Sequence, residues 1–204
     1  MDSLEAHYSA RDIEARILAA LRAAGLNPEQ RLSPAELGAL DHFHTGGLRA
    51  SRDLMELAQI RAGDRVLDIG AGLAGPARLL ASALGCRVDC IEMSSDYCTG
   101  AKLLNRLTGL DDLIAVHEGS ALDLPFDDDS FDAVWMQNVG MNIADKRGLY
   151  GEAYQVKKNI TIDDLTFWCQ QVIKGEIDLT HAALIRNSIQ VITGTAAFVG
   201  PNTV

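Results

Sequence analysis

The clearest chemical signal in the sequence is a glycine-rich turn, followed one strand later by an acidic side chain. Val66–Gly75 has the sequence VLDIGAGLAG, an apolar run that leads into glycines spaced G-x-G-x-x-G. Glycines at such a turn let the backbone approach a ligand closely where a helix begins. Glu92 follows Gly72 by 20 residues, where a nucleotide-binding fold places its ribose-binding carboxylate. The pattern predicts a site for a ligand that contains a nucleoside.

Asp68 distinguishes between two ligands that such a loop could hold, a dinucleotide such as NAD and S-adenosylmethionine. A carboxylate two residues before the first glycine would face a pyrophosphate, and like charges about 4 Å apart repel by roughly 4 kcal/mol at an effective dielectric constant of 20. S-adenosylmethionine has no phosphate and carries an ammonium and a sulfonium group, so Asp68 favours it. The purely structural alternatives are that Asp68 caps the next turn and that Glu92 is a solvated strand end.

Strand-length apolar runs alternate with helical segments from residue 65 onward, which predicts an α/β fold with a parallel sheet. The expected strands are Arg65–Ile69, Arg87–Met93, Leu113–His117 and Phe131–Met136. The expected helices between and after them are Gly75–Leu84, Ser95–Leu107 and Asp145–Val156. We place this core at residues 63–156.

The first 62 residues have apolar residues at helical spacing and predict an N-terminal helical extension. The segment Ser33–Glu36 (SPAE) combines a serine N-cap, a proline at the first helical position and a glutamate that completes a capping box. Three helices are expected, from Ser9 to Gly25, from Ser33 to Asp41 and from Leu48 to Ile60.

The composition of the chain changes after Val156. Arg supplies 12 of the 14 basic residues up to that point but one of the four beyond it, and Thr rises from three in 156 residues to six in 48. We therefore interpret residues 157–204 as an atypical tail that completes or covers the edge of the sheet. Helices after Thr161 and Asp178, or a hairpin of Ser188–Thr193 with Thr195–Val199, remain open alternatives.

Composition limits the partners and the compartment. The 204 residues carry a formal charge of −10, which repels nucleic acid and anionic membrane surfaces. No stretch approaches the roughly 20 apolar residues of a membrane helix, and residues 1–10 lack the pattern of an export signal. The four cysteines contain no C-x-x-C pair, so we expect reduced thiols in the cytoplasm and no metal site. The sequence does not fix the oligomeric state, and a homo-oligomer is among the assemblies it allows.

Several of these motifs together resemble the class I S-adenosylmethionine-dependent methyltransferases, in particular the small-molecule group (methyltransferase type 11) with the ubiquinone/menaquinone and sarcosine/dimethylglycine enzymes. The resemblance runs from about Tyr8 to Val156. Its motifs are VLDIGAGLAGPARLL (Val66–Leu80), CIEM (Cys90–Met93), GSALDLPFDDDSFDAVW (Gly119–Trp135) and MNIADKRGLYGEA (Met141–Ala153). It implies a Rossmann-like, doubly wound and mostly parallel sheet, with S-adenosylmethionine as cofactor and a small-molecule methyl acceptor.

The resemblance also implies roles for individual residues on the cofactor. The backbone of Gly70, Ala71 and Gly72 would lie against it, and Asp68 would order its amino-acid end. Glu92 would bind both ribose hydroxyls.

Further roles follow at the adenine and methionine ends. Met93 would lie on the adenine, and Ser120 and Ala121 would border the adenine edge, although many relatives have an aspartate in place of Ser120. Gln137 and Asn138 would border the methionine portion and the acceptor.

The remaining predicted roles concern the N-terminal segment, which would close the site and supply a base for the acceptor's proton. The stretch around His44 would close over the cofactor. An acceptor amine or hydroxyl must lose a proton at some stage, and His44 or Tyr8 could assist that loss.

One departure from the family pattern affects the activity. The Pro-Gly-Gly turn that relatives carry after the fourth helix is replaced by residues 154–160 (YQVKKNI), which predicts an exposed fourth-strand edge. Two alternatives to an active methyltransferase therefore stay open, a cofactor-binding protein with impaired catalysis and an NAD(P)-dependent oxidoreductase.

Overall fold

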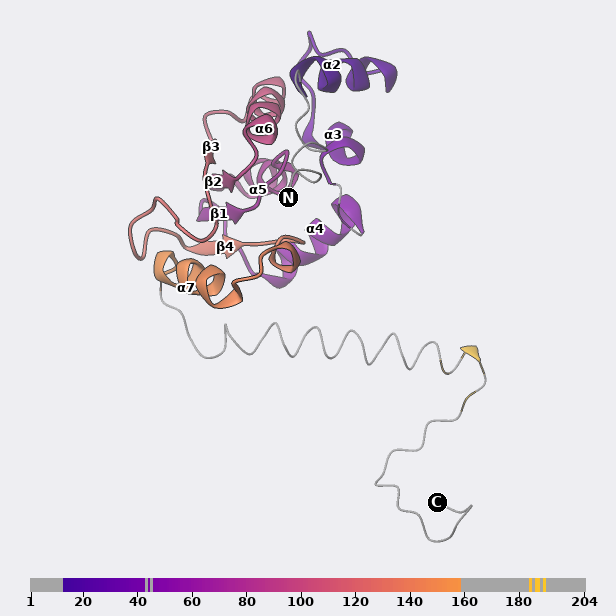
Figure 1. Cartoon of the computed structure of the whole chain (residues 1–204). Coiled ribbons are helices and arrows are strands. Elements are labelled where there is room, and N and C mark those ends of the chain that lie inside the picture. The colour runs from indigo at the N-terminus through magenta and orange to yellow at the C-terminus, as the bar shows by residue number, and fades with distance from the viewer. Residues whose placement is uncertain are drawn as a thin grey trace. The chain divides into compact units, whose positions relative to one another are not determined.

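The computed structural model describes residues 13–42, 44, 46–158, 184, 186, 187 and 189 (Figure 1). The chain divides into two compact units, residues 1–159 and residues 160–204. In the second unit the backbone N–H groups of Asn187 and Ile189 donate to the carbonyl of Leu184 and form a turn. The helix or hairpin predicted for the tail, Tyr8 and Cys169 lie outside the described residues.

Four parallel strands form the sheet of the first unit, in the order β3-β2-β1-β4. They are β1 (Arg65–Ile69), β2 (Arg87–Glu92), β3 (Ile114–Glu118) and β4 (Ala133–Trp135). The strand order reverses between β1 and β4, and open α/β sheets bind their ligands at the carboxyl ends of the strands beside this point. Where the strands pair, Asp68 of β1 lies beside Cys90 of β2 on one side and Trp135 of β4 on the other.

The predicted parallel α/β core is confirmed, with small differences at the strand ends. β3 begins and ends one residue later than expected, and β4 covers only the centre of the predicted segment. The short β4 is flanked by Phe131, which forms an isolated parallel bridge with Lys157. The Phe131 N–H donates to the Val156 carbonyl at 3.0 Å, and the Lys158 N–H donates to the Phe131 carbonyl at 2.9 Å. The predicted role of the remaining tail in covering this edge falls on residues outside the described ones.

Helices cover both faces of the sheet (Figure 1). They are α5 (Gly75–Leu84), α6 (Ser95–Thr108) and α7 (Lys146–Val156), with a 3₁₀ turn η1 (Gly140–Asn142) before α7. The starts of α6 and α7 have local causes, because Ser94 Oγ accepts from the Tyr97 N–H and the Asp145 carboxylate accepts from the Gly148 N–H. Alternate β1 residues face opposite cores, Val66 packing with α5 and Leu67 with α7.

Three further helices precede the sheet, α2 (Ile13–Ala23), α3 (Pro34–Asp41) and α4 (Gly47–Leu57). α2 packs on α6, whereas α3 and α4 pack on α5. The capping box is present, since Glu36 accepts from both the Ser33 N–H at 2.8 Å and the Ser33 hydroxyl at 2.7 Å. The predicted end of the third helix at Ile60 was wrong, because Gln59 has a positive φ of 51° and ends the helical path earlier.

No helix among the described residues combines the length and the apolar character needed to cross a membrane.

Candidate active site

Asp68 is a buried carboxylic acid at the carboxyl end of β1. Only 2% of its surface is exposed, and its Oδ2 atom has no hydrogen-bond partner among the residues that the structure describes. Burial, with a smaller contribution from the Glu92 carboxylate, raises the pKa of Asp68 to about 8 against the opposing effect of the Arg78 guanidinium. A buried acceptor without a donor is costly. The site therefore favours a ligand that brings a cation or an N–H group to Asp68.

Glu92 ends β2 and holds the glycine loop. Its Oε2 accepts from the Gly72 N–H at 3.0 Å, and its Oε1 accepts from the Ser94 N–H at 2.9 Å. Each carboxylate oxygen has further lone pairs. Glu92 is thus fixed in position by the backbone and keeps acceptor capacity for ligand hydroxyl groups.

The glycine loop is closed on one side and open on the other. The N–H groups of Gly70 and Ala71 both donate to the Ile91 carbonyl, at 2.8 and 3.3 Å. A Cβ atom at Gly70 would lie 2.3 Å from a methyl group of Val139, whereas one at Gly72 would meet nothing within 4 Å. Both glycines have a positive φ. The backbone at Gly72 is therefore accessible to a ligand.

The remaining predicted contacts lie in the loops after β2, β3 and β4. Met93 is 79% exposed, and the exposed Ser120 accepts from the Leu122 N–H at 3.1 Å. Ala121 packs against the core beneath α7, and Asn138 is exposed with a φ of 58°. The exposed Met93 is available to a flat ligand, whereas Ala121 has no polar side-chain atom to offer one.

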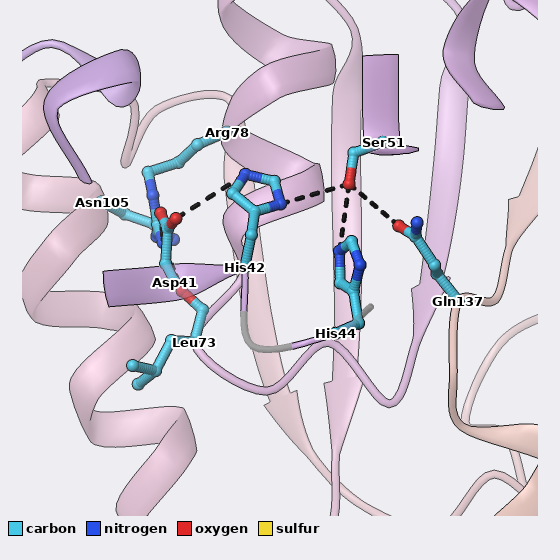
Figure 2. Close-up of polar contacts among 8 residues, drawn as sticks. All are labelled: Asp41, His42, His44, Ser51, Leu73, Arg78, Asn105 and Gln137. Atoms are coloured by element: carbon cyan, nitrogen blue, oxygen red, sulfur yellow. Dashed lines mark hydrogen bonds and ion pairs between the residues drawn. The ribbon is translucent and has the colours of Figure 1, made fainter. Parts of the chain in front are cut away.

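His44 and Gln137 meet through Ser51, although they are 93 positions apart in the chain (Figure 2). The Ser51 hydroxyl lies 3.1 Å from His44 Nε2 and 3.0 Å from Gln137 Oε1. It also lies 3.1 Å from Nδ1 of His42, whose ring is edge-on to that of His44. Two predicted site residues from distant parts of the chain are thus joined by Ser51, with His42 beside it, and neither of these two side chains belongs to a recognisable sequence motif.

A second polar cluster lies beside the first, around Arg78 of α5 (Figure 2). The Arg78 guanidinium donates to Asp41 at 2.7 Å, to Asn105 at 2.7 Å and to the backbone carbonyl of Leu73. Arg78 has no exposed surface. Because Leu73 belongs to the turn between β1 and α5, this cluster connects the N-terminal helices to the glycine loop.

The described residues were compared with the side-chain groups that usually bind a metal ion. The residues that the structure describes contain no group of three or more histidine, cysteine, aspartate or glutamate side chains that could hold an ion. The acidic run Asp127–Asp129 is exposed, as expected for a solvated turn.

A comparison with known protein families finds a match for the segment that carries this site. A family profile described as a methyltransferase domain matches residues 67–159. The segment that carries the site is thus similar to the methyltransferase domain family.

Two of the proteins similar to this segment are named for small-molecule substrates. Glycine/sarcosine/dimethylglycine N-methyltransferase of Actinopolyspora halophila is 39% identical over 94 residues, which are 46% of this chain and 17% of that protein. A putative sarcosine dimethylglycine methyltransferase from Galdieria sulphuraria is 30% identical with a TM-score of 0.52, over 54% of this chain and 43% of that one.

A second similar structure includes S-adenosylhomocysteine. Haemonchus contortus phosphoethanolamine N-methyltransferase 2, in complex with phosphomonomethylethanolamine and S-adenosylhomocysteine, is 27% identical with a TM-score of 0.54, over 58% of this chain and 28% of that one. This chain spans less than half the length of each of these three relatives.

The Rossmann-like fold predicted from the sequence is that of class I methyltransferases, as the methyltransferase domain and its structural neighbours show. The comparisons support neither the oxidoreductase nor the impaired alternative. The structure brings Asp68, Glu92 and the glycine loop together at one end of the sheet. Ser51, His42 and Arg78 were missed because no local spacing marks them, and only their burial identifies them.

Proposed function

We propose that the chain binds S-adenosylmethionine at the carboxyl ends of β1, β2 and β4 and transfers its methyl group to a small-molecule acceptor. The observation that carries the proposal is the buried, unpaired Asp68 oxygen beside Glu92 and the open backbone of Gly72. The residues present fit a ligand with a cationic end and a ribose. A pyrophosphate would instead add negative charge beside two carboxyl groups.

The bound cofactor would supply an electrophilic methyl carbon on its sulfonium. Asp68 would hold the ammonium end, and Glu92, already anchored to the backbone, would accept from ribose hydroxyls. Holding the acceptor in line with the methyl carbon and excluding water account for most of the catalysis that such a transfer needs. We propose His44 as the group that assists loss of the acceptor's proton. Tyr8 stays a second predicted candidate for this role.

The individual site assignments are proposals of the same kind. Met93 would cover the adenine and Ser120 and Ala121 would border it, while Gln137 and Asn138 would face the acceptor. The three buried free thiols, Cys86, Cys90 and Cys98, support a cytoplasmic location because disulfides are rare there. The formal charge of −10 supports a partner that is a small molecule and not a nucleic acid.

Isothermal titration of the full chain with S-adenosylmethionine and S-adenosylhomocysteine tests the cofactor site. Asp68→Asn and Glu92→Gln are expected to weaken binding roughly tenfold to a hundredfold, because each removes a charged acceptor. Asp112→Asn is the matched control, since Asp112 is an exposed carboxylate at the opposite end of the sheet. Absence of binding to the folded wild-type chain would overturn the proposal.

Transfer of a labelled methyl group is the second test. Sarcosine and dimethylglycine serve as probe acceptors, because the relatives named for them share this domain. Label recovered in either probe, and lost in Asp68→Asn, would support methyl transfer. Cofactor binding without transfer to these probes would exclude them and direct a wider acceptor screen.

A further inference from the structure

Arg78 of α5 is a fully buried arginine next to the glycine loop. Residues 75–81 are all buried, and Arg78 is the one charged side chain among them. Its guanidinium donates to the backbone carbonyl of Leu73, and its backbone N–H donates to the carbonyl of Ala74 at 3.1 Å. Arg78 thus contacts both residues between the second and third glycines of the G-x-G-x-x-G pattern.

The peptide that joins Leu73 to Ala74 has an unfavourable neighbour conformation. Ala74 has a φ of 61° and a ψ of 35°, in the left-handed region that disfavours residues with a Cβ atom. Both ends of the peptide are hydrogen-bonded, because the Leu73 carbonyl accepts from Arg78 and the Ala74 N–H donates to the Ala71 carbonyl at 2.8 Å. A rotation of this peptide would break both bonds, so the two bonds together select one conformation of the turn.

This turn lies directly beside the contacts proposed for the cofactor. Leu73 follows Gly72, whose N–H donates to Glu92 and whose other side is open to a ligand. A rotated Leu73–Ala74 peptide would change the path of the backbone immediately after Gly72. The bond from Arg78 to the Leu73 carbonyl therefore bears on the geometry in which Gly72 and Glu92 receive the cofactor.

The guanidinium is itself held by two side chains from other helices (Figure 2). Nη2 donates to Asp41 Oδ2 and Nη1 donates to Asn105 Oδ1, each at 2.7 Å. Asp41 ends α3, and its Oδ1 lies 3.6 Å from Nε2 of His42. Apolar side chains in place of a buried ion pair are often as stable or more stable, so stability alone does not account for this pair. Apolar side chains could not supply a donor to the Leu73 carbonyl.

We propose that Arg78 is a positioning residue that fixes the Leu73 carbonyl, and with it the glycine loop, in the conformation that binds S-adenosylmethionine. Asp41 and Asn105 orient the guanidinium for this contact. The role rests on the cofactor binding proposed above. Arg78 acts through the backbone of the loop, since the side chain has no exposed surface with which to touch a ligand.

The carbonyl contact can be observed without any ligand. Full-length protein labelled with ¹³C at the leucine carbonyls and ¹⁵N at alanine gives one correlation for each Leu-Ala pair, of which the sequence has four. The Leu73–Ala74 signal is assigned by its loss in Leu73→Ile. A carbonyl carbon that loses a hydrogen bond moves upfield, so this signal reports the contact directly.

The test variant must remove the contact without leaving a buried charge. Arg78→Met alone would leave Asp41 unpaired, so Arg78→Met is combined with Asp41→Leu. In this double variant the Leu73–Ala74 carbonyl should move upfield. An unmoved signal in the folded double variant would overturn the proposal.

A matched arginine provides the control. Arg106 lies on α6 and pairs with Glu14, with about half of each side chain exposed. Arg106→Met removes the same group from the surface and should leave the Leu73–Ala74 signal in place. A shift of equal size in Arg106→Met would overturn the specific role of Arg78.

Affinity for S-adenosylhomocysteine connects the contact to the cofactor site. A loop that is competent to bind about one tenth of the time has an apparent affinity about tenfold weaker. Isothermal titration should show a loss of this size in the double variant, whereas Arg106→Met should stay within about twofold of wild type. Wild-type affinity in a double variant whose Leu73–Ala74 signal has moved would overturn the positioning role.

The two measurements separate this proposal from the proposed function. Absence of binding to the folded wild-type chain would remove the proposed function, and with it the cofactor part of this role. The carbonyl signal would still decide whether Arg78 holds the turn between Gly72 and α5.

Discussion

The carboxylate of Asp41 and the guanidinium of Arg78 form a salt bridge of 2.7 Å, with 1% and 0% of their side chains exposed. Removing one partner of such a pair leaves an uncompensated buried charge. Asp41→Ala is therefore expected to lower the free energy of unfolding by about 3–5 kcal/mol, measured by urea denaturation.

Two further variants test this explanation. Arg49→Ala breaks a largely exposed ion pair with Asp53 and should leave the urea midpoint unchanged. Asp41→Leu combined with Arg78→Met should cost less than Asp41→Ala, because no charge then remains buried. A wild-type midpoint in Asp41→Ala would contradict the prediction.

The pKa of about 8 at Asp68 makes stability depend on pH. In the unfolded chain this carboxyl ionises near its ordinary pKa of 3.8, so between pH 4 and 8 the folded state binds more protons than the unfolded state. Its contribution is fully present below pH 4 and is lost as pH rises through 8, by up to about 1.4 kcal/mol per pH unit. Asp68→Asn should remove this decline, and parallel wild-type and variant curves of unfolding free energy against pH would refute it.

Cofactor binding should release a proton from Asp68. An ammonium group beside the carboxyl favours its ionised form, so binding near pH 7 should release up to about one proton. Titrations in two buffers with different ionisation enthalpies measure this number. Asp68→Asn should release none from this site, and equal release in both proteins would place the proton elsewhere.

Gly70 and Gly72 should respond differently to alanine. Both have positive φ, which costs an alanine roughly 1–2 kcal/mol, but only at Gly70 would the new methyl collide with Val139. Gly70→Ala should therefore be the less stable variant in urea, and adding Val139→Ala should restore part of the loss. Gly72→Ala should stay folded and lose cofactor affinity, because its methyl group enters the open side of the loop. Full affinity in Gly72→Ala would argue against a ligand there.

The described thiols should react slowly in the folded protein. Burial raises the pKa of Cys98 to about 11 and raises those of Cys86 and Cys90. Because the thiolate is the reactive form, a disulfide reagent at pH 8 should modify these residues far more slowly in the native state than in urea. Cys169→Ser removes the thiol outside the described residues, and rapid reaction of that native variant would contradict the prediction.

Local patterns in the sequence predicted most of the elements. The helix from Gly75 to Leu84 has the predicted bounds, and the next helix begins at Ser95 as predicted. These features depend on neighbouring residues, through periodicity and hydrogen bonds to the local backbone. The shortened β4 could not be predicted in the same way, because its limits depend on which residues pair across strands.

The site was predictable in part for the same reason. Asp68, Glu92 and the glycine loop form a recurring local pattern around β1 and β2. Ser51 has no such signal, because its contact with Gln137 joins residues 86 positions apart. Arg78 is harder still, since an arginine on an amphipathic helix is usually exposed.

Gly75 brings the N-terminal helices so close to α5 that a Cβ atom there would lie 2.5 Å from the Asp41 carbonyl oxygen. Together with the Asp41 carboxylate, this contact makes the end of α3 part of the interior that surrounds Arg78. A shortened chain that began at residue 63 would leave the guanidinium without its counter-ion and would not be a minimal cofactor-binding unit. Exchange of N-terminal segments between related enzymes would succeed only where the incoming segment carries an acid opposite Arg78. The predicted boundary between the N-terminal helical extension and the core, at residue 63, is therefore not a place at which the protein can be divided.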